Sequence, residues 1–176
     1  MMSRAIPGSR SAGAAGAGTR PLKVVYVYRR RHPSAFSIEE LFHAIAGEMR
    51  AHADVVEYET RGRSKAVADA AALRRLDADI YHLTGDITYL ALLLPPRRTV
   101  VTIHDLGNYR HGVRGARRWL YKWLWLLLPM RHAAATTAVS AETRAAILQD
   151  LKVAPSAVRV IENCHQNLFT PPFTQY

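Results

Sequence analysis

His104 and Asp105 follow directly after Thr99–Ile103, a short run of β-branched and apolar residues. A run with almost no polar alternation predicts a strand that is covered on both faces, as in a parallel sheet. Residues just past the carboxyl end of such a strand lie at the crevice where open α/β sheets bind ligands. The sequence therefore predicts that His104 faces a ligand, with Asp105 beside it.

Two other interpretations of this pair stay open. His104 and Asp105 resemble the metal-binding pairs of phosphohydrolases, but those sites need further His and Asp ligands that arrive from helices. Asp105 could instead simply cap a turn. Cys164 is the only cysteine, so no thiolate cluster is available for a structural metal. We expect no metal at this site.

Polar side chains also follow other predicted strands. Right-handed crossovers place the carboxyl ends of parallel strands at one edge of the sheet, so we expect these residues to meet in one crevice. The expected substrate-binding residues are Arg29, Arg30, His32, Ser34, Gly85, Asp86, Asp105 and Ser140. Ser140 is also typical of a helix N-cap, and that N-terminus could bind an anion. His82 lies inside a predicted strand, where a structural role is at least as well supported as a functional one.

Hydrophobic periodicity indicates which elements position these residues. Short apolar runs alternate with helical patterns, which predicts an α/β fold: a Rossmann-like, doubly wound parallel sheet with helices on both faces. The expected strands are Leu22–Tyr28, Asp54–Tyr58, Asp79–Leu83, Thr99–Ile103, Ala134–Val139 and Val158–Ile161. The expected helices are Ser37 to near His52 (opened by a capping box with Glu40), Ala66–Leu76, Ile87–Leu94, Arg114–Leu128 and Ala141–Leu151.

The domain organisation follows from composition. Residues 1–20 are rich in Ala, Gly and Arg without an apolar run, which predicts a disordered basic tail and argues against a secretory signal. Residues 21–163 form the single predicted domain. The sequence has no G-x-S-x-G elbow, so it gives no evidence for nucleophilic catalysis. It also has no G-x-x-x-x-G-K-[ST] phosphate loop and no G-x-G-x-x-G after the first strand, which disfavours a self-contained nucleotide-binding Rossmann enzyme.

The net charge of +10 indicates an anionic partner. Leu106–Ala141 contains no Asp or Glu, and a helix is expected within it over Arg114–Met130. At about 100° per residue, one broad apolar face, which we assign to the core, contains Ala116, Trp119, Leu120, Trp123, Leu124, Leu127 and Met130. The opposite face, assigned to an anionic membrane surface, contains Arg114, Arg118, Tyr121, Lys122 and Trp125.

Other interpretations of the cationic face remain. It could be merely solvated, or it could cover the edge of the sheet. The apolar stretch Trp123–Met130 is far shorter than the roughly 20 residues that span a bilayer, so we expect it not to cross. Nucleic acid is disfavoured as a partner, because no recognised nucleic-acid motif is present.

Four segments carry a resemblance to a known family. The sequence resembles the N-terminal, acceptor-binding half of GT-B glycosyltransferases, and most of all the retaining enzymes of family 4. The resemblance covers about Leu22 to Phe169. The segments that carry it are Asp79–Gly85 (DIYHLTG), Thr102–Leu106 (TIHDL), Thr137–Arg144 (TAVSAETR) and Val158–Asn163 (VRVIEN).

The resemblance implies that the acceptor and the donor bind to two different domains. This half would bind a sugar or lipid-linked acceptor, and a second Rossmann-like domain would bind the nucleotide-sugar donor, which is a co-substrate. It implies no metal and no covalently bound cofactor. His104 would lie near the sugar-transfer centre. The loop from Arg29 to Ser34 would lie by the donor phosphates or the acceptor.

The sequence also departs from the family pattern. Arg29-Arg30-Arg31-His32-Pro33 replaces the glycines that many members have in the first loop, and Glu162-Asn163 replaces the usual Pro-Asn. Residues 164–176 would begin an interdomain linker, and the sequence ends at Tyr176 where the donor domain is expected. We therefore expect a truncated enzyme that is incomplete on its own, cytoplasmic and peripheral at the inner face of the plasma membrane. The alternative is a non-catalytic basic module for anionic membrane or nucleic acid.

Overall fold

The structure, a computed structural model, describes residues 20–30 and 37–162. The predictions for His32, Ser34, the side chain of Ser37, the tail 1–19 and the linker 164–176 lie outside the described residues.

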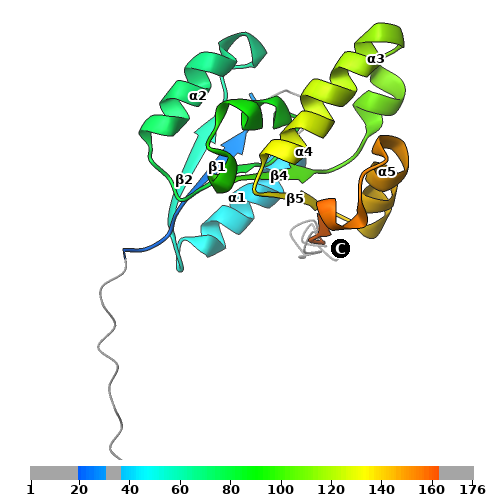
Figure 1. The fold of residues 1–176 in the computed structure, drawn as a ribbon. Helices are drawn as coiled ribbons and strands as arrows, with labels where there is room; N and C mark the ends of the chain where they lie inside the picture. Colours follow the sequence, from blue (N-terminus) through cyan, green and yellow to red (C-terminus); the bar gives the residue numbers. More distant parts are fainter. Residues whose placement is uncertain (1–19, 31–36, 163–176) are drawn as a thin grey trace, which may run out of the picture.

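Six strands form one parallel sheet in the order β2-β1-β3-β4-β5-β6 (Figure 1). This confirms the predicted doubly wound parallel sheet. Because β1 and β3 are neighbours, the direction of strand addition reverses between them. Their carboxyl ends form a topological switch point, where such folds bind ligands. The strands are β1 (Lys23–Tyr28), β2 (Asp54–Glu59), β3 (Ile80–Leu83), β4 (Thr99–Ile103), β5 (Ala135–Ala138) and β6 (Arg159–Val160).

Helices cover both faces of the sheet, as predicted (Figure 1). On one face, Phe42 and Ala46 of α1 (Ser37–Met49) pack on Val24 and Tyr26 of β1. The other face forms the larger core, which explains why the strand sequences are apolar almost without interruption. It is covered by α2 (Ala66–Arg75), a 3-10 helix (Thr88–Leu93), α4 (Leu128–His132) and α5 (Ala141–Leu151).

The predicted helix after β4 is confirmed in place, but it is not uniform. It runs through α3 (Gly115–Tyr121), a π-helical segment (Lys122–Leu127) and α4. Pro129 has no N–H to donate to the carbonyl of Trp125, four residues earlier. The buried Thr88 hydroxyl donates to that carbonyl instead. The irregular stretch is thus fixed to the 3-10 helix beside it.

The predicted orientation of this helix is wrong over its first turns, although Leu127 and Met130 of the predicted apolar face do lie at the core. Trp119 and Leu120, assigned to the core, are 64% and 49% exposed. Tyr121 and Trp125, assigned to a membrane surface, lie against the protein and stack on each other with ring centroids 5.4 Å apart. The physical reason is that the Tyr121 hydroxyl has a carboxylate partner, Asp86, on this side of the helix.

The cations of the predicted membrane face are also divided. Lys122 Nζ donates to the carbonyl of Asp150 near the end of α5, where a cation suits the helix dipole. The Arg118 guanidinium lies 4.5 Å from the centroid of the Tyr109 ring. Arg114 is exposed at the beginning of α3. The five residues therefore do not form one outward face.

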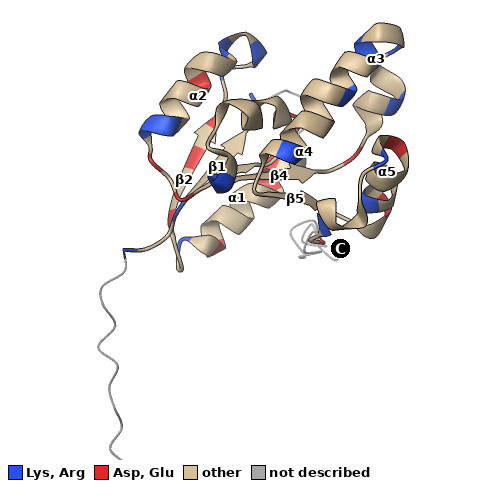
Figure 2. Ribbon diagram, in the orientation of Figure 1, with Lys and Arg blue, Asp and Glu red and all other residues tan. Residues whose placement is uncertain are grey.

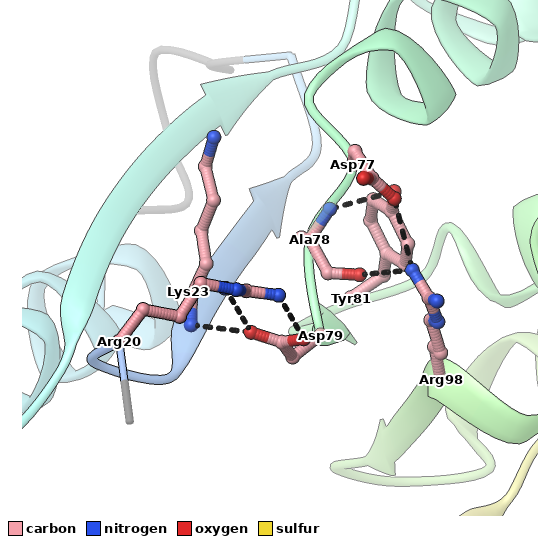
Figure 3. Close-up of polar contacts among 7 residues, drawn as sticks. All are labelled: Arg20, Lys23, Asp77, Ala78, Asp79, Tyr81 and Arg98. Atoms are coloured by element: carbon pink, nitrogen blue, oxygen red, sulfur yellow. Dashed lines mark hydrogen bonds and ion pairs between the residues drawn. The ribbon is translucent and has the colours of Figure 1, made fainter. Parts of the chain in front are cut away.

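Carboxylates tie the amino ends of three strands together, at the edge opposite the switch point (Figure 3). Asp79 accepts hydrogen bonds from the backbone N–H of Lys23 (2.9 Å) and from two guanidinium nitrogens of Arg20 (2.7 and 2.8 Å). The Lys23 N–H, followed by Arg20, holds the pKa of the Asp79 carboxyl below its ordinary value. Arg98, just before β4, donates to the Asp77 carboxylate at 3.0 Å.

Asp69 joins α2 to the carboxyl end of β2 and the segment that follows it. Its fully buried carboxylate on α2 accepts hydrogen bonds from the Tyr58 hydroxyl and from the backbone N–H and Nε of Arg61. Asp69→Ala should lower the free energy of unfolding by about 2 kcal/mol, because it leaves these donors unpaired. Urea denaturation measures the change. Arg74→Ala, at an exposed position on the same helix, should change it by less than about 0.5 kcal/mol. An equal effect of both variants would contradict this role.

Candidate functional site

A cavity of about 110 Å³ opens at the switch point between the ends of β1, β3 and β4. It brings together five of the predicted site residues, namely Arg29, Gly85, Asp86, His104 and Asp105. Thr88, Thr102, Asn108 and Tyr121 complete its polar lining. Arg30 is described and exposed but does not line this cavity, and neither does Ser140.

The His104 ring has a defined tautomer. Its Nε2 lies 2.8 Å from the backbone carbonyl oxygen of Thr84. Because a carbonyl can only accept, Nε2 carries the proton and Nδ1 keeps a free lone pair when the ring is neutral. Burial lowers the pKa of His104 below its ordinary value, although the bond to Thr84 acts in the other direction. His104 is therefore neutral at pH 7 and offers the site a hydrogen-bond acceptor.

The backbone around His104 is also fixed. Its carbonyl oxygen accepts a hydrogen bond from the Thr143 hydroxyl, at 2.9 Å, in the first turn of α5. Ser140 accepts from the Thr143 N–H at 3.1 Å, which confirms Ser140 as the N-cap of α5. Ser140 thus supports the strand end on which His104 lies.

Asp86 is the carboxylate of the cavity. Its Oδ1 accepts from the Tyr121 hydroxyl and its Oδ2 from the Asn108 amide, each at 2.8 Å. Asp86 is exposed to the cavity, yet burial by the surrounding protein raises its pKa, while the two hydrogen bonds act to lower it. The result is an oriented carboxylate that can accept hydrogen bonds from a ligand hydroxyl.

Asp105 caps a turn, which is one of the interpretations that the sequence leaves open for this residue. Its Oδ1 accepts from the backbone N–H of Gly107 at 2.6 Å. A Cβ at position 107 would lie 3.0 Å from the same oxygen, so glycine permits this close approach. Asp105 therefore shapes the turn after β4 and also lines the cavity.

Arg29 is oriented by α1. Its Nε donates to a carboxylate oxygen of Glu39, which is mostly buried, and its side chain borders the cavity. The sequence predicts Glu39 only as part of a helix, so its contact with Arg29 is new from the structure. Asn108 is not among the predicted site residues, and Tyr121 is predicted on a different surface. Their position in the sequence could have indicated a role in this cavity, because Asn108 and Tyr121 both follow β4, and His104 lies at the end of that strand.

His82 lies beneath the site and is structural. Its Nε2 is 2.7 Å from the Thr102 hydroxyl, which is 2.8 Å from the Thr137 hydroxyl on β5. The edge of the Phe42 ring packs on both His82 and His104, with centroids 5.3 and 5.8 Å away. Burial lowers the pKa of His82 to about 4. The imidazole is thus neutral and links three strands below the cavity.

This burial predicts a pH dependence of stability. The unfolded chain takes up a proton on His82 near pH 6.5, whereas the folded chain does so only near pH 4. The free energy of unfolding should therefore fall by on the order of 3 kcal/mol as the pH drops through this window. His104 contributes in the same direction. His82→Gln should flatten the slope in urea titrations, and an unchanged slope would contradict the assignment.

In the described part of the chain, no helix combines the length and the hydrophobicity that a bilayer span requires. No three His, Cys, Asp or Glu side chains in residues 20–30 and 37–162 are grouped so as to hold a metal ion.

The fold and the cavity define a class: a Rossmann-like α/β domain with its ligand site at the switch point. The chain belongs to glycosyltransferase family 4, whose family model matches residues 24–165. This confirms the resemblance to family 4 glycosyltransferases. A comparison with curated proteins finds no match.

Among solved structures, the chain is similar in fold to a glycosyltransferase from Rickettsia africae ESF-5. The TM-score is 0.50, the sequence identity is 14%, and the match covers 82% of this chain. The chain spans 43% of the length of that protein. At this identity the similarity supports the fold alone.

Proposed function

We propose that this chain is the acceptor-binding half of a nucleotide-sugar-dependent, retaining hexosyltransferase that acts on a lipid-linked acceptor at the cytoplasmic face of a membrane. Family membership supports the reaction class and its stereochemistry. The observation that carries the proposal is the pair of oriented acceptor groups, His104 Nδ1 and the Asp86 carboxylate, in one cavity at the switch point.

The chemistry of these groups suits sugar transfer. A retaining transfer develops positive charge on the sugar ring and negative charge on the departing diphosphate. A neutral His104 accepts a hydrogen bond from a sugar hydroxyl without adding a positive charge beside the ring. The Asp86 carboxylate stabilises the developing positive charge or orients the hydroxyl of the acceptor. The backbone carbonyl of His104 is already bonded to Thr143, so we assign the contact to the imidazole.

The test is transfer by an enzyme that joins residues 1–176 to a donor-binding domain. Radiolabelled nucleotide sugars are supplied one at a time, together with a membrane lipid extract. The proposal expects label from one donor to enter a lipid-extractable product with the anomeric configuration of the donor retained. A product of inverted configuration would overturn the retaining assignment. Absence of transfer from every donor would favour a non-catalytic binding module.

A further inference from the structure

An exposed apolar surface lies on the helix that borders the cavity. We define the outer helix face as Trp119, Leu120 and Trp123, with Arg117 and Arg131 beside them. Trp119 and Trp123 contact each other with ring centroids 6.2 Å apart, and the Arg131 guanidinium lies 5.7 Å from the centroid of the Trp123 ring. Trp119 and Leu120 are 64% and 49% exposed, and Trp123 is half-buried, with part of its ring against the core. A contiguous patch of this kind marks an interaction surface, unlike a single exposed apolar residue.

The patch lies on a projecting part of the molecule. Every residue from Arg114 to Leu120 is exposed, and Figure 1 shows α3 extending away from the sheet. A flat partner can therefore reach the outer helix face without meeting the rest of the domain. A helix is about 10 Å in diameter, and the next residue, Tyr121, contacts Asp86 in the cavity. The patch and the cavity lie on opposite sides of one helix.

The charge around the patch indicates the kind of partner. Figure 2 shows Lys and Arg along the segment from α3 to α4 and no Asp or Glu on it. Among the described residues, Arg117 and Arg131 have no carboxylate within ion-pair distance. Indole rings prefer the boundary between headgroups and acyl chains, and cations beside them are attracted to anionic lipid.

We propose that the outer helix face docks this chain on an anionic bilayer surface, with Trp119 and Leu120 at the level of the headgroups and Arg117 and Arg131 on lipid phosphates. The proposal rests on the proposed function for the identity of the acceptor, but vesicle binding is measured without any donor. Docking in this orientation would hold the cavity about one helix diameter from the surface, within reach of a lipid-linked acceptor.

Vesicle sedimentation of the full chain tests the proposal. The chain should bind vesicles of equimolar phosphatidylglycerol and phosphatidylcholine at low salt, and pure phosphatidylcholine at least tenfold more weakly. The double variants Trp119→Ser/Leu120→Ser and Arg117→Glu/Arg131→Glu should each lose at least tenfold in binding. Salt should weaken binding of the unaltered chain. Equal binding to neutral vesicles would overturn the proposal.

Matched controls lie on α2. Arg74→Glu/Arg75→Glu makes the same change of net charge at two exposed positions, and Val67→Ser removes an apolar side chain that is 76% exposed. Both should bind vesicles like the unaltered chain. If the charge control loses as much binding as Arg117→Glu/Arg131→Glu, attachment depends on net charge alone and the outer helix face is not the contact.

Tryptophan fluorescence provides a second readout, because all three tryptophans lie on this helix. Vesicles should shift the emission to shorter wavelength, and Trp119→Phe/Trp123→Phe, which leaves only Trp125, should lose the shift. A shift that persists from Trp125 would place the inner face at the membrane and overturn the proposal.

Self-association without vesicles, detected by ultracentrifugation and abolished by Trp119→Ser/Leu120→Ser, would instead assign the surface to a second copy. The Trp119→Ser/Leu120→Ser enzyme should keep its transfer rate with a water-soluble acceptor.

Discussion

Replacing His104 by alanine should lower kcat/KM for sugar transfer by roughly 10²–10³-fold while the domain remains folded. The imidazole holds Nδ1 as an acceptor because Nε2 is committed to the Thr84 carbonyl. Alanine removes the contact with the sugar, and the loss falls mainly on kcat if the contact strengthens in the transition state. Steady-state transfer assays with the complete enzyme measure the change.

His111→Ala is the matched control for His104→Ala, because His111 is exposed and does not line the cavity. The control should retain full activity. The lowered pKa of His104 adds a pH criterion: protonation of this group should reduce the rate only below the ordinary range of a histidine. Equal rates for the unaltered enzyme and His104→Ala would remove His104 from the mechanism.

Asp86→Asn should lower kcat/KM by about 10²-fold, because an amide is a weaker acceptor than a carboxylate and cannot stabilise positive charge. Burial raises the pKa of Asp86, so its acid limb in the pH profile should lie above that of an ordinary aspartate. Tyr121→Phe removes a hydrogen bond that lowers this pKa, so it should move the acid limb to higher pH.

The comparison of Asp86→Asn with Tyr121→Phe separates a substrate contact from a structural one. If Asp86 only anchored Tyr121, the two variants would lose activity equally, with the same unfolding midpoint. The expected result is a larger loss for Asp86→Asn and a shifted pH profile for Tyr121→Phe. Equal losses with no shift would contradict the assignment of Asp86 to the substrate.

The position of the site could be predicted because it depends on the sheet. The uninterrupted apolar run Thr99–Ile103 identifies a buried parallel strand, and the residue that follows a parallel strand necessarily reaches the carboxyl edge. His104 and Asp86 were therefore placed correctly from local sequence alone. Their hydrogen-bond partners were not, because Thr84, Asn108 and Tyr121 reach them through tertiary packing.

The orientation of the helix after β4 could not be predicted from periodicity. Both of its faces contain large aromatic side chains, so the hydrophobic pattern does not identify the inner one. Two tertiary contacts decide it: the Tyr121 hydroxyl finds Asp86, and Thr88 bonds the Trp125 carbonyl that Pro129 leaves free. Asp86 and Thr88 follow β3, so they can be placed beside this helix only when the order of the strands in the sheet is known.

The central claim is that the switch-point cavity binds the acceptor. The most direct measurement is backbone and histidine-ring NMR of the isotopically labelled chain, titrated with the acceptor that supports transfer. The account predicts that the largest shifts occur at Gly85, Asp86, His104 and Asn108 and saturate together. Shifts confined to another surface, such as that around Val67 on α2, with the His104 ring unchanged, would contradict it.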